Sequence, residues 1–194
     1  MPHTPPTRRA VLGGLGATGL LGLAGCSALV PGTVRPNRDP RVVPEPLACE
    51  DSEVNRYPSG YGSDELSWGA ADGFSLRVDG DSFEYGETAR VSLRYTWPGS
   101  ATIGNREKYN LETLTEAGWQ ELRSAAGLVT LTDLGFEKFT GQGWTWDIEL
   151  TESGMEDATE ADVTVCTALR PGRYRFVYWG LDGAVAVTFD LVRE

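Results

Sequence analysis

The sequence contains one histidine, His3, and only two lysines, Lys108 and Lys138. Histidine is the commonest general base and the commonest transition-metal ligand in proteins. Because His3 lies in a segment that we expect to be removed, the mature chain would contain no histidine. This absence excludes serine–histidine and cysteine–histidine catalysis and histidine-ligated zinc. The remaining residues imply no cofactor.

Basic residues are scarce overall, since 17 Lys and Arg stand against 28 Asp and Glu and give a net charge of −11. Removal of residues 1–25 would take away two arginines and leave −13. Such a charge excludes nucleic-acid binding through a basic surface and disfavours attraction to anionic lipid head groups. Acidic, lysine-poor usage resembles the proteins of salt-loving archaea, and an ordinary acidic secreted protein is the alternative.

The sequence lacks an apolar run long enough for an ordinary membrane span. Residues 10–24 are apolar or small, but they number only 15 and include five glycines, whereas a transmembrane helix needs about 20 apolar residues. A basic start, a short apolar middle and a small-residue end are typical of a signal peptide. Arg8 and Arg9 resemble a twin-arginine export signal, and the letters LAGC that end at Cys26 resemble a lipobox. We therefore predict a signal peptide over 1–25 and a lipid on Cys26; an ordinary signal peptide with an incidental cysteine is the alternative.

Cysteine is also rare, and its three copies are an odd number for an exported chain. If Cys26 carries lipid, Cys49 and Cys166 remain, and we predict a disulfide between them. The loop so closed spans 117 residues, for which the chain-entropy model gives a stabilisation of about 4 to 5 kcal/mol. Two buried free thiols are the alternative. The expected location is the outer face of the cytoplasmic membrane, with the lipid as the contact to the bilayer.

The chain divides into three parts after this assignment. Residues 1–25 form the signal peptide, and residues 26–48 form a lipidated, proline-rich spacer without apolar periodicity. Extended proline-rich chain of about 20 residues reaches about 60 Å, so we expect the spacer to hold the body away from the membrane. Residues 49–194 form one domain, which is long enough to bury a core.

Alternation of apolar and polar residues dominates residues 49–194. It runs through FSLRV (74–78), ETARVSLRYTW (87–97), WTWDIEL (144–150) and RYRFVYW (173–179). This period is typical of half-buried strands, and the turn at 116–118 indicates a hairpin. The pattern predicts an all-β fold, an antiparallel β-sandwich of about seven strands.

Three motifs add a family resemblance. FEYGETARVSLRY (83–95) resembles the opening of many bacterial and archaeal immunoglobulin-like domains, and LRPGRYRF (169–176) is similar to their segment in which a Pro-Gly turn precedes a corner tyrosine. Gly118 and Trp119 fall where such domains commonly have a tryptophan. The resemblance implies an immunoglobulin-like sandwich with a binding or scaffold role, and it brings no catalytic residues with it.

Loop aromatics are the first candidate binding residues. Tyr57, Tyr61 and Trp68 lie in a segment rich in Gly, Ser and Pro before the first clear strand, where they would offer a stacking platform for a sugar or a peptide. The alternative is that they cover a sheet edge. We expect a non-catalytic module that binds an envelope protein or packs in the envelope, with a carbohydrate or small-ligand module as the second hypothesis.

Acidic residues are the other candidates, and none of them makes a strong site. The segment 152–162 is dense in carboxylates but lacks the spacing of a calcium-binding EF-hand loop, so a solvated loop is favoured. Asp79 and Asp81 indicate a turn. Asp147 and Glu149 share a strand face and are the raw material of a carboxylate-dependent hydrolase, although paired surface charges explain them better. We predict no metal site and no enzyme.

Overall fold

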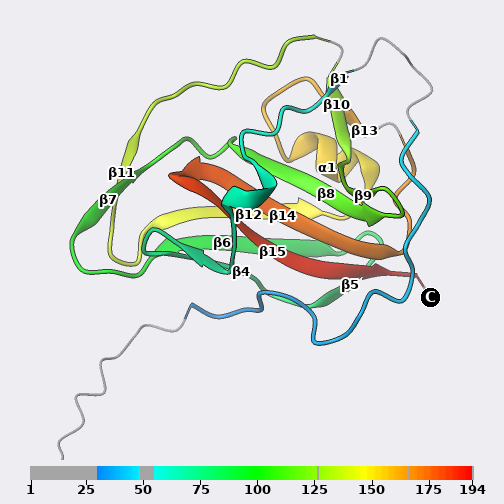
Figure 1. The fold of residues 1–194 in the computed structure, drawn as a ribbon, viewed down its shortest axis with the longest axis horizontal. Coiled ribbons are helices and arrows are strands. Elements are labelled where there is room, and N and C mark those ends of the chain that lie inside the picture. Colours follow the sequence, from blue (N-terminus) through cyan, green and yellow to red (C-terminus); the bar gives the residue numbers. More distant parts are fainter. Residues whose placement is uncertain (1–29, 49–54, 126, 166, 194) are drawn as a thin grey trace, which may run out of the picture.

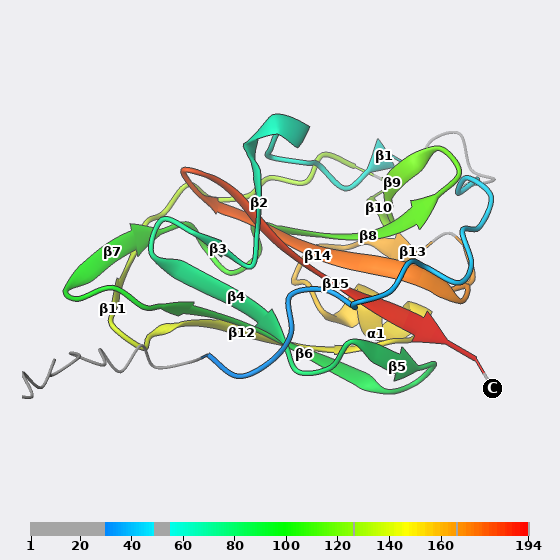
Figure 2. The ribbon, with the colours of Figure 1, turned by 60° about the horizontal axis from the view of Figure 1, so that its bottom comes forward.

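The computed structural model describes residues 30–48, 55–125, 127–165 and 167–193, which form an all-β fold. Two principal sheets pack face to face with the apolar core between them (Figure 2). The smaller sheet has the order β12 (Gly143–Glu149), β6 (Thr88–Tyr95), β4 (Phe74–Val78), β3 (Ala70–Ala71). The larger sheet has the order β2 (Leu66–Trp68), β15 (Gly183–Val192), β14 (Gly172–Leu181), β8 (Tyr109–Thr115), β9 (Gly118–Glu121), and β5 (Ser82–Glu84) also pairs with β15.

Two small sheets flank this sandwich (Figure 1). One joins β1 (Asn55–Arg56), β10 (Arg123–Ala125) and β13 (Thr164–Val165). The other is a two-stranded ribbon of β7 (Ser100–Ile103) and β11 (Phe136–Phe139), which lies at the far end of the molecule from β5. A 3-10 turn, η1 (Ser63–Glu65), and a short helix, α1 (Glu152–Asp157), complete the described elements.

The antiparallel all-β prediction is confirmed, and β12 shows why. Trp146 and Ile148 are fully buried in the core, whereas Asp147 and Glu149 between and beyond them are exposed. β12 pairs antiparallel with β6, and Trp146 lies opposite Val91. The number of strands is well above the expected seven, because several strands are too short to show an alternation in the sequence. In addition, β2 and β5 pair with β15 in parallel.

The predicted hairpin at 116–118 is present as the turn between β8 and β9. Thr115 pairs with Gly118, whose φ is 92°. A three-residue hairpin loop places its last residue in this left-handed region, where glycine has no Cβ to clash. The Thr115 hydroxyl donates to the carbonyl oxygen of Gly118 at 2.8 Å, and the turn is thereby fixed.

Both faces of β14 are buried, which its alternation did not predict. Phe176 and Tyr178 point into the core, but Val177 on the opposite face is also fully buried, and Arg175 is 9% exposed. Val177 packs with Ala184 and Ala186 beneath the partly buried side chains of Tyr61, Leu66, Trp68 and Trp179. Side chains of β2, of β14 and of the segment before β2 therefore cover this part of the outer face of the larger sheet.

The N-terminal strap, which we define as residues 30–48, also covers the sandwich. Thr33 forms a two-way backbone bridge with Val78, at N–O distances of 2.7 and 3.0 Å. The amide of Thr188 donates to the carbonyl oxygen of Val34 at 2.8 Å, so the strap crosses from one principal sheet to the other. Pro36 is buried where the chain makes this crossing.

Side chains hold the rest of the strap in place. Arg38 forms an ion pair with Asp190 at 3.2 Å, and the amide of Leu47 donates to Oε1 of Gln120 at 2.7 Å. The amide of Glu116 donates to the carbonyl oxygen of Pro44 at 3.0 Å. The expectation of a free extended spacer is therefore wrong for residues 30–48, because a proline-rich chain still offers carbonyl groups and the remaining amides to a sheet.

Candidate functional site

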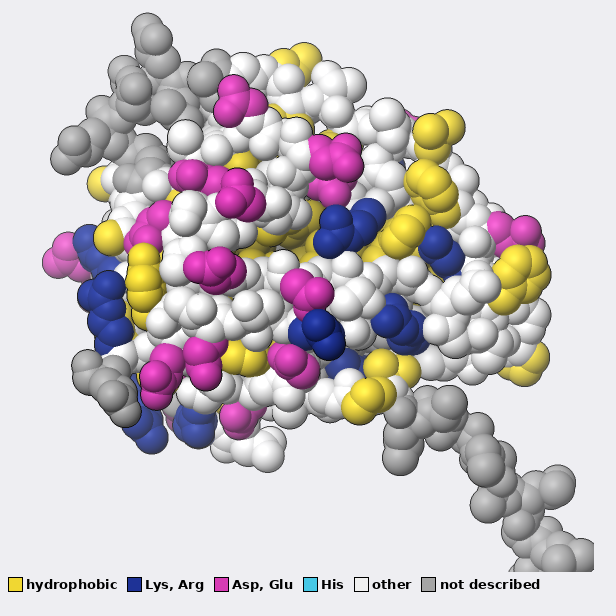
Figure 3. Space-filling model, turned by 180° about the vertical axis from the view of Figure 1, so that it is seen from behind, with side chains coloured by type: hydrophobic (Ala, Val, Ile, Leu, Met, Phe, Trp, Pro, Cys, Tyr) yellow, Lys and Arg dark blue, Asp and Glu magenta, His cyan; other side chains and the backbone are white. Residues whose placement is uncertain are grey.

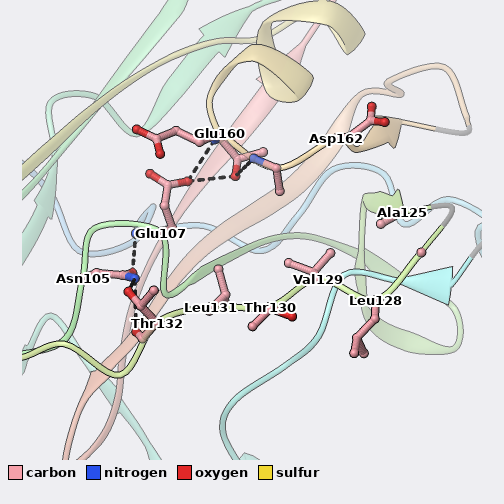
Figure 4. Close-up of a pocket in the computed structure, with 13 residues that line it drawn as sticks. Asn105, Glu107, Ala125, Leu128, Val129, Thr130, Leu131, Thr132, Glu160 and Asp162 are labelled. Carbon is pink, nitrogen blue, oxygen red and sulfur yellow. Dashed lines mark hydrogen bonds between the residues drawn. The ribbon is translucent and has the colours of Figure 1, made fainter.

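An open hollow of 530 Å³ lies beside the small sheet that contains β10. Its walls are the turn 105–107 before β8, the loop 127–132 after β10 and the segment 159–162 after α1 (Figure 4). We call it the acidic hollow, because Glu107, Glu160 and Asp162 lie on its walls. Its volume falls within the range of ordinary ligand sites, about 300 to 1,000 Å³.

Hydrogen bonds from one turn hold the two other walls. Glu107 Oε2 accepts from the Thr159 hydroxyl at 2.8 Å and from the Glu160 amide at 3.3 Å. Asn105 Nδ2 donates to the Thr132 hydroxyl at 2.8 Å and to its carbonyl oxygen at 3.2 Å. These contacts, drawn in Figure 4, tie both loops to the start of β8 and preorganise the hollow.

An apolar floor supports the hollow. Tyr57, Ala125 and Val163 form a small buried cluster, and the partly buried Val129, Leu131 and Ala161 pack against it. Tyr57 is 2% exposed, and its hydroxyl donates to the carbonyl oxygen of Glu107 at 3.3 Å. Burial raises the pKa of Tyr57, so its hydroxyl stays neutral and keeps donating at neutral pH. At the rim, Leu128 is 95% exposed.

The chemistry of the hollow suits a ligand that donates hydrogen bonds. Among the described residues that line it, none is Lys or Arg. Arg106 belongs to the turn 105–107 but does not line the hollow, and its Nη1 lies 3.8 Å from Oε1 of Glu107. The side chains of Glu160 and Asp162 are exposed and accept hydrogen bonds from ammonium, guanidinium or hydroxyl groups.

The three aromatic residues expected to form a platform lie in two separate clusters. Tyr57 lies beneath the acidic hollow, whereas Tyr61 and Trp68 pack over the outer face of the larger sheet. The Tyr61 hydroxyl donates to Glu112 Oε1 at 2.5 Å, and Glu112 also accepts from Arg175. Trp68 is half-buried, with the guanidinium of Arg35 in the strap 4.7 Å from its ring centroid.

Three of the acidic candidates, Asp147, Glu152 and Glu156, are occupied by structural contacts. Asp147 accepts from Arg90 Nε at 2.6 Å on an exposed strand face, where both side chains are more than half exposed. The segment 152–162, expected as a solvated loop, contains α1 instead. Glu152 and Glu156 in α1 accept from the amides of Leu169 and Val165, both at 2.7 Å. In the described ranges, no three His, Cys, Asp or Glu side chains are placed to hold a metal ion.

The export and covalent sites lie outside the described residues. This applies to Arg8 and Arg9, to Cys26, and to the expected Cys49–Cys166 disulfide, all of which stay predictions. Within the described part of the chain, no helix has the length and apolarity required to cross a membrane.

Sequence reasoning missed two of the three walls of the acidic hollow, whereas the third, 159–162, lies in the acidic segment 152–162. Residues 105–107 and 127–132 have no periodicity and no motif, and Glu107 reads as one acidic residue among 28. The only signal is the short apolar stretch at 128–131, which follows a strand but shows no strand alternation. No family model matches the chain, and no curated protein matches it significantly, so its function has to be inferred from its own residues.

Proposed function

We propose that the protein is a lipoprotein anchored on the outer face of the cytoplasmic membrane, with a non-catalytic binding module as its domain. It is exported by the signal around Arg8 and Arg9 and anchored by a lipid on Cys26. The acidic hollow binds a basic segment of an envelope protein. The observation that carries this proposal is the 530 Å³ hollow with three carboxylates on its walls and no Lys or Arg among its described lining residues.

Charge and shape together favour a basic protein segment. Carboxylates at a concave site attract Lys and Arg and align them, and this complementarity contributes to specificity and to the rate of association. Leu128 at the rim adds an apolar contact. A glycan is the second candidate, because carboxylates and the threonine hydroxyls of the loop also bind sugar hydroxyl groups.

The strand order supports the immunoglobulin-like resemblance and, with it, a binding role. In such domains strands A, B and E lie together in one sheet, and C, F and G form the other. Here β4, β6 and β12 are neighbours in one sheet, and β8, β14 and β15 in the other. The Tyr174 hydroxyl donates to the carbonyl oxygen of Arg170 at 2.7 Å, the kind of contact made by a tyrosine corner.

Replacement of Cys26 by Ser is expected to release the protein from the membrane or to stall its processing. Two acyl or alkyl chains give stable anchoring. Serine has no thiol that could form the thioether to the lipid, and the cleavage before residue 26 depends on that linkage. Cell fractionation and intact mass decide the outcome. A mature-sized Cys26→Ser chain that stays with the membrane fraction would contradict the anchor.

Reversal of charge in the acidic hollow is expected to abolish partner binding. We expect the Glu160→Lys/Asp162→Lys variant to bind the partner at least about tenfold more weakly, because like charges then face each other. The Cys26→Ser domain, immobilised, captures the partner from detergent-solubilised native membranes at the salt concentration of the native medium. Mass spectrometry identifies the captured protein and measures its amount.

A control variant separates the hollow from net charge. Glu84→Lys/Glu116→Lys changes the net charge by the same amount at two exposed positions, on β5 and in the β8–β9 turn. We expect this variant to capture the partner like the parent domain. Equal capture by both double variants would contradict the site, and displacement of the captured protein by purified envelope polysaccharide would favour the glycan.

A further inference from the structure

The end of the sandwich that carries β7 and β11 exposes large apolar side chains. Trp97 is 60% exposed, Phe139 51%, Phe136 36% and Leu134 64%. We call this set of four residues the aromatic end. The Thr140 hydroxyl donates to the carbonyl oxygen of Trp97 at 2.7 Å, and this contact joins the turn before β7 to the turn after β11. Trp97 therefore lies in a turn that is hydrogen-bonded to the end of β11, the strand that carries Phe136 and Phe139.

The strap begins at this same end. Val30 and Pro31 line a shallow depression together with Tyr95, Thr96, Thr140 and Gly141, which flank Trp97 and Phe139 in the sequence. Figure 2 shows the first described residues of the strap, in dark blue, beside the turn that joins β11 to β12. Residue 30 and the aromatic end are consequently neighbours in space.

Val30 follows Cys26 by only four positions along the chain. Even fully extended, four residues span at most about 14 Å. This inference rests on the proposed lipid anchor: if Cys26 carries lipid, residue 30 lies within about 14 Å of the membrane surface. Because the strap is docked on the sandwich, it does not lengthen the link between the domain and the lipid. The aromatic end therefore lies against the bilayer instead of up to about 60 Å away.

The charge distribution agrees with this orientation. The segments 94–104 and 133–145, which form this end, carry two basic and two acidic side chains, whereas the whole chain has 17 basic and 28 acidic ones. Figure 3 shows hydrophobic side chains over this end and many Asp and Glu side chains over the rest of this face, whereas Lys and Arg lie at both ends. Most of the acidic surface, which anionic head groups repel, thus faces away from the anchor.

We propose that the aromatic end is a membrane-resting surface, with Trp97 and Phe139 in the interfacial layer of the bilayer that holds the lipid on Cys26. Tryptophan rings favour this layer because they are amphipathic. The short tether keeps the rings at a high effective concentration near the surface, so a weak contact suffices. Lipid anchor and aromatic end together fix the orientation of the domain on the membrane.

Trp97 itself provides the measurement. The protein has six tryptophans. All six lie in the described ranges, and Trp97 is the one whose side chain is largely exposed. Lipidated full-length protein, with lipid on Cys26 verified by intact mass, is reconstituted into phosphatidylcholine vesicles that carry a nitroxide at carbon five of the acyl chain. We expect the lipid-dependent quenching of tryptophan fluorescence to fall at least about twofold in Trp97→Phe, because this ring lies in the labelled layer.

Trp68→Phe is the matched control, since Trp68 is half-buried beneath Arg35 on the outer face of the larger sheet. It is expected to leave the quenching unchanged. Equal quenching of Trp97→Phe and parent protein, with lipid present on Cys26, would overturn the membrane-resting surface and leave the anchor standing. That result would instead point to protein docking at the aromatic end. A Cys26 without lipid would contradict the proposed anchor before any vesicle measurement.

Discussion

Replacement of Trp146 by Ala is expected to lower the free energy of unfolding by about 3 to 5 kcal/mol. The Trp146 ring is fully buried between the sheets, with centroids 4.7 Å from Phe176, 5.6 Å from Tyr178 and 5.9 Å from Tyr109. Its Nε1 donates to the carbonyl oxygen of Arg106 at 3.1 Å. Alanine would leave a cavity and an unpaired carbonyl, against a total stability of about 5 to 15 kcal/mol for such a domain.

Urea unfolding of the Cys26→Ser domain measures this loss. Trp97→Ala is the control, because its ring is 60% exposed and its removal opens no cavity; we expect a change of about 0.5 kcal/mol. If Trp146→Ala fails to fold, Trp146→Phe retains a ring and is expected to show a smaller loss in the same direction. Similar losses for Trp146→Ala and Trp97→Ala would contradict the core packing described above.

Trp146 also illustrates what the sequence predicts well. Trp146 alternates with Asp147 and Glu149, so the strand has only one apolar face. The inward orientation of Trp146 follows from this period of two. The same alternation in β6 and β4 predicts the rest of the smaller sheet. An exposed outer face makes the period visible, and parts of β6 and β12 retain one.

The larger sheet was harder to predict, because its outer face is covered by chain without periodicity. Arg175 looks like a solvent-facing residue in RYRFVYW, yet it is buried against Glu112 and stacks on Trp119, with its guanidinium carbon 4.5 Å from the ring centroid. Val34 and Thr33 in the strap hold their places by backbone hydrogen bonds, which leave no side-chain pattern. The acidic hollow escaped prediction for a similar reason, since two of its three walls are irregular segments without a side-chain pattern.

The second large effect is expected at a buried ion pair under the small sheet of β10. Arg123 is fully buried; its Nε donates to Glu121 Oε1 and its Nη2 to the carbonyl oxygen of Tyr109, both at 2.9 Å. The rings of Tyr57 and Tyr109 lie on the guanidinium, with centroids 4.4 and 4.5 Å from its carbon. Burial raises the pKa of Glu121 above its ordinary value, although Arg123 opposes that shift.

Replacement of Arg123 by Met is expected to lower the free energy of unfolding by about 3 to 5 kcal/mol at neutral pH, because it leaves the Glu121 carboxylate buried without its cation. The loss depends on pH. Without Arg123, the pKa of Glu121 in the folded state rises further above its unfolded value of about 4.3. The folded variant then binds the proton more tightly than the unfolded chain, so its deficit against the parent is full above the folded pKa. The deficit shrinks as the pH falls toward the unfolded value.

Arg90→Met provides the matched control, because Arg90 pairs with Asp147 at the surface, where the side chains are 60% and 52% exposed. We expect a much smaller loss than for Arg123→Met, and this loss decreases further between 0.1 and 1 M salt as the screening length falls from about 10 to about 3 Å. The deficit of Arg123→Met, in contrast, should change little with salt, since the pair is shielded from mobile ions. Urea unfolding of both variants at two salt concentrations and at pH 5 and 7 separates these behaviours. Equal losses for the two variants, or a salt-sensitive and pH-independent deficit in Arg123→Met, would contradict a buried, mutually dependent pair.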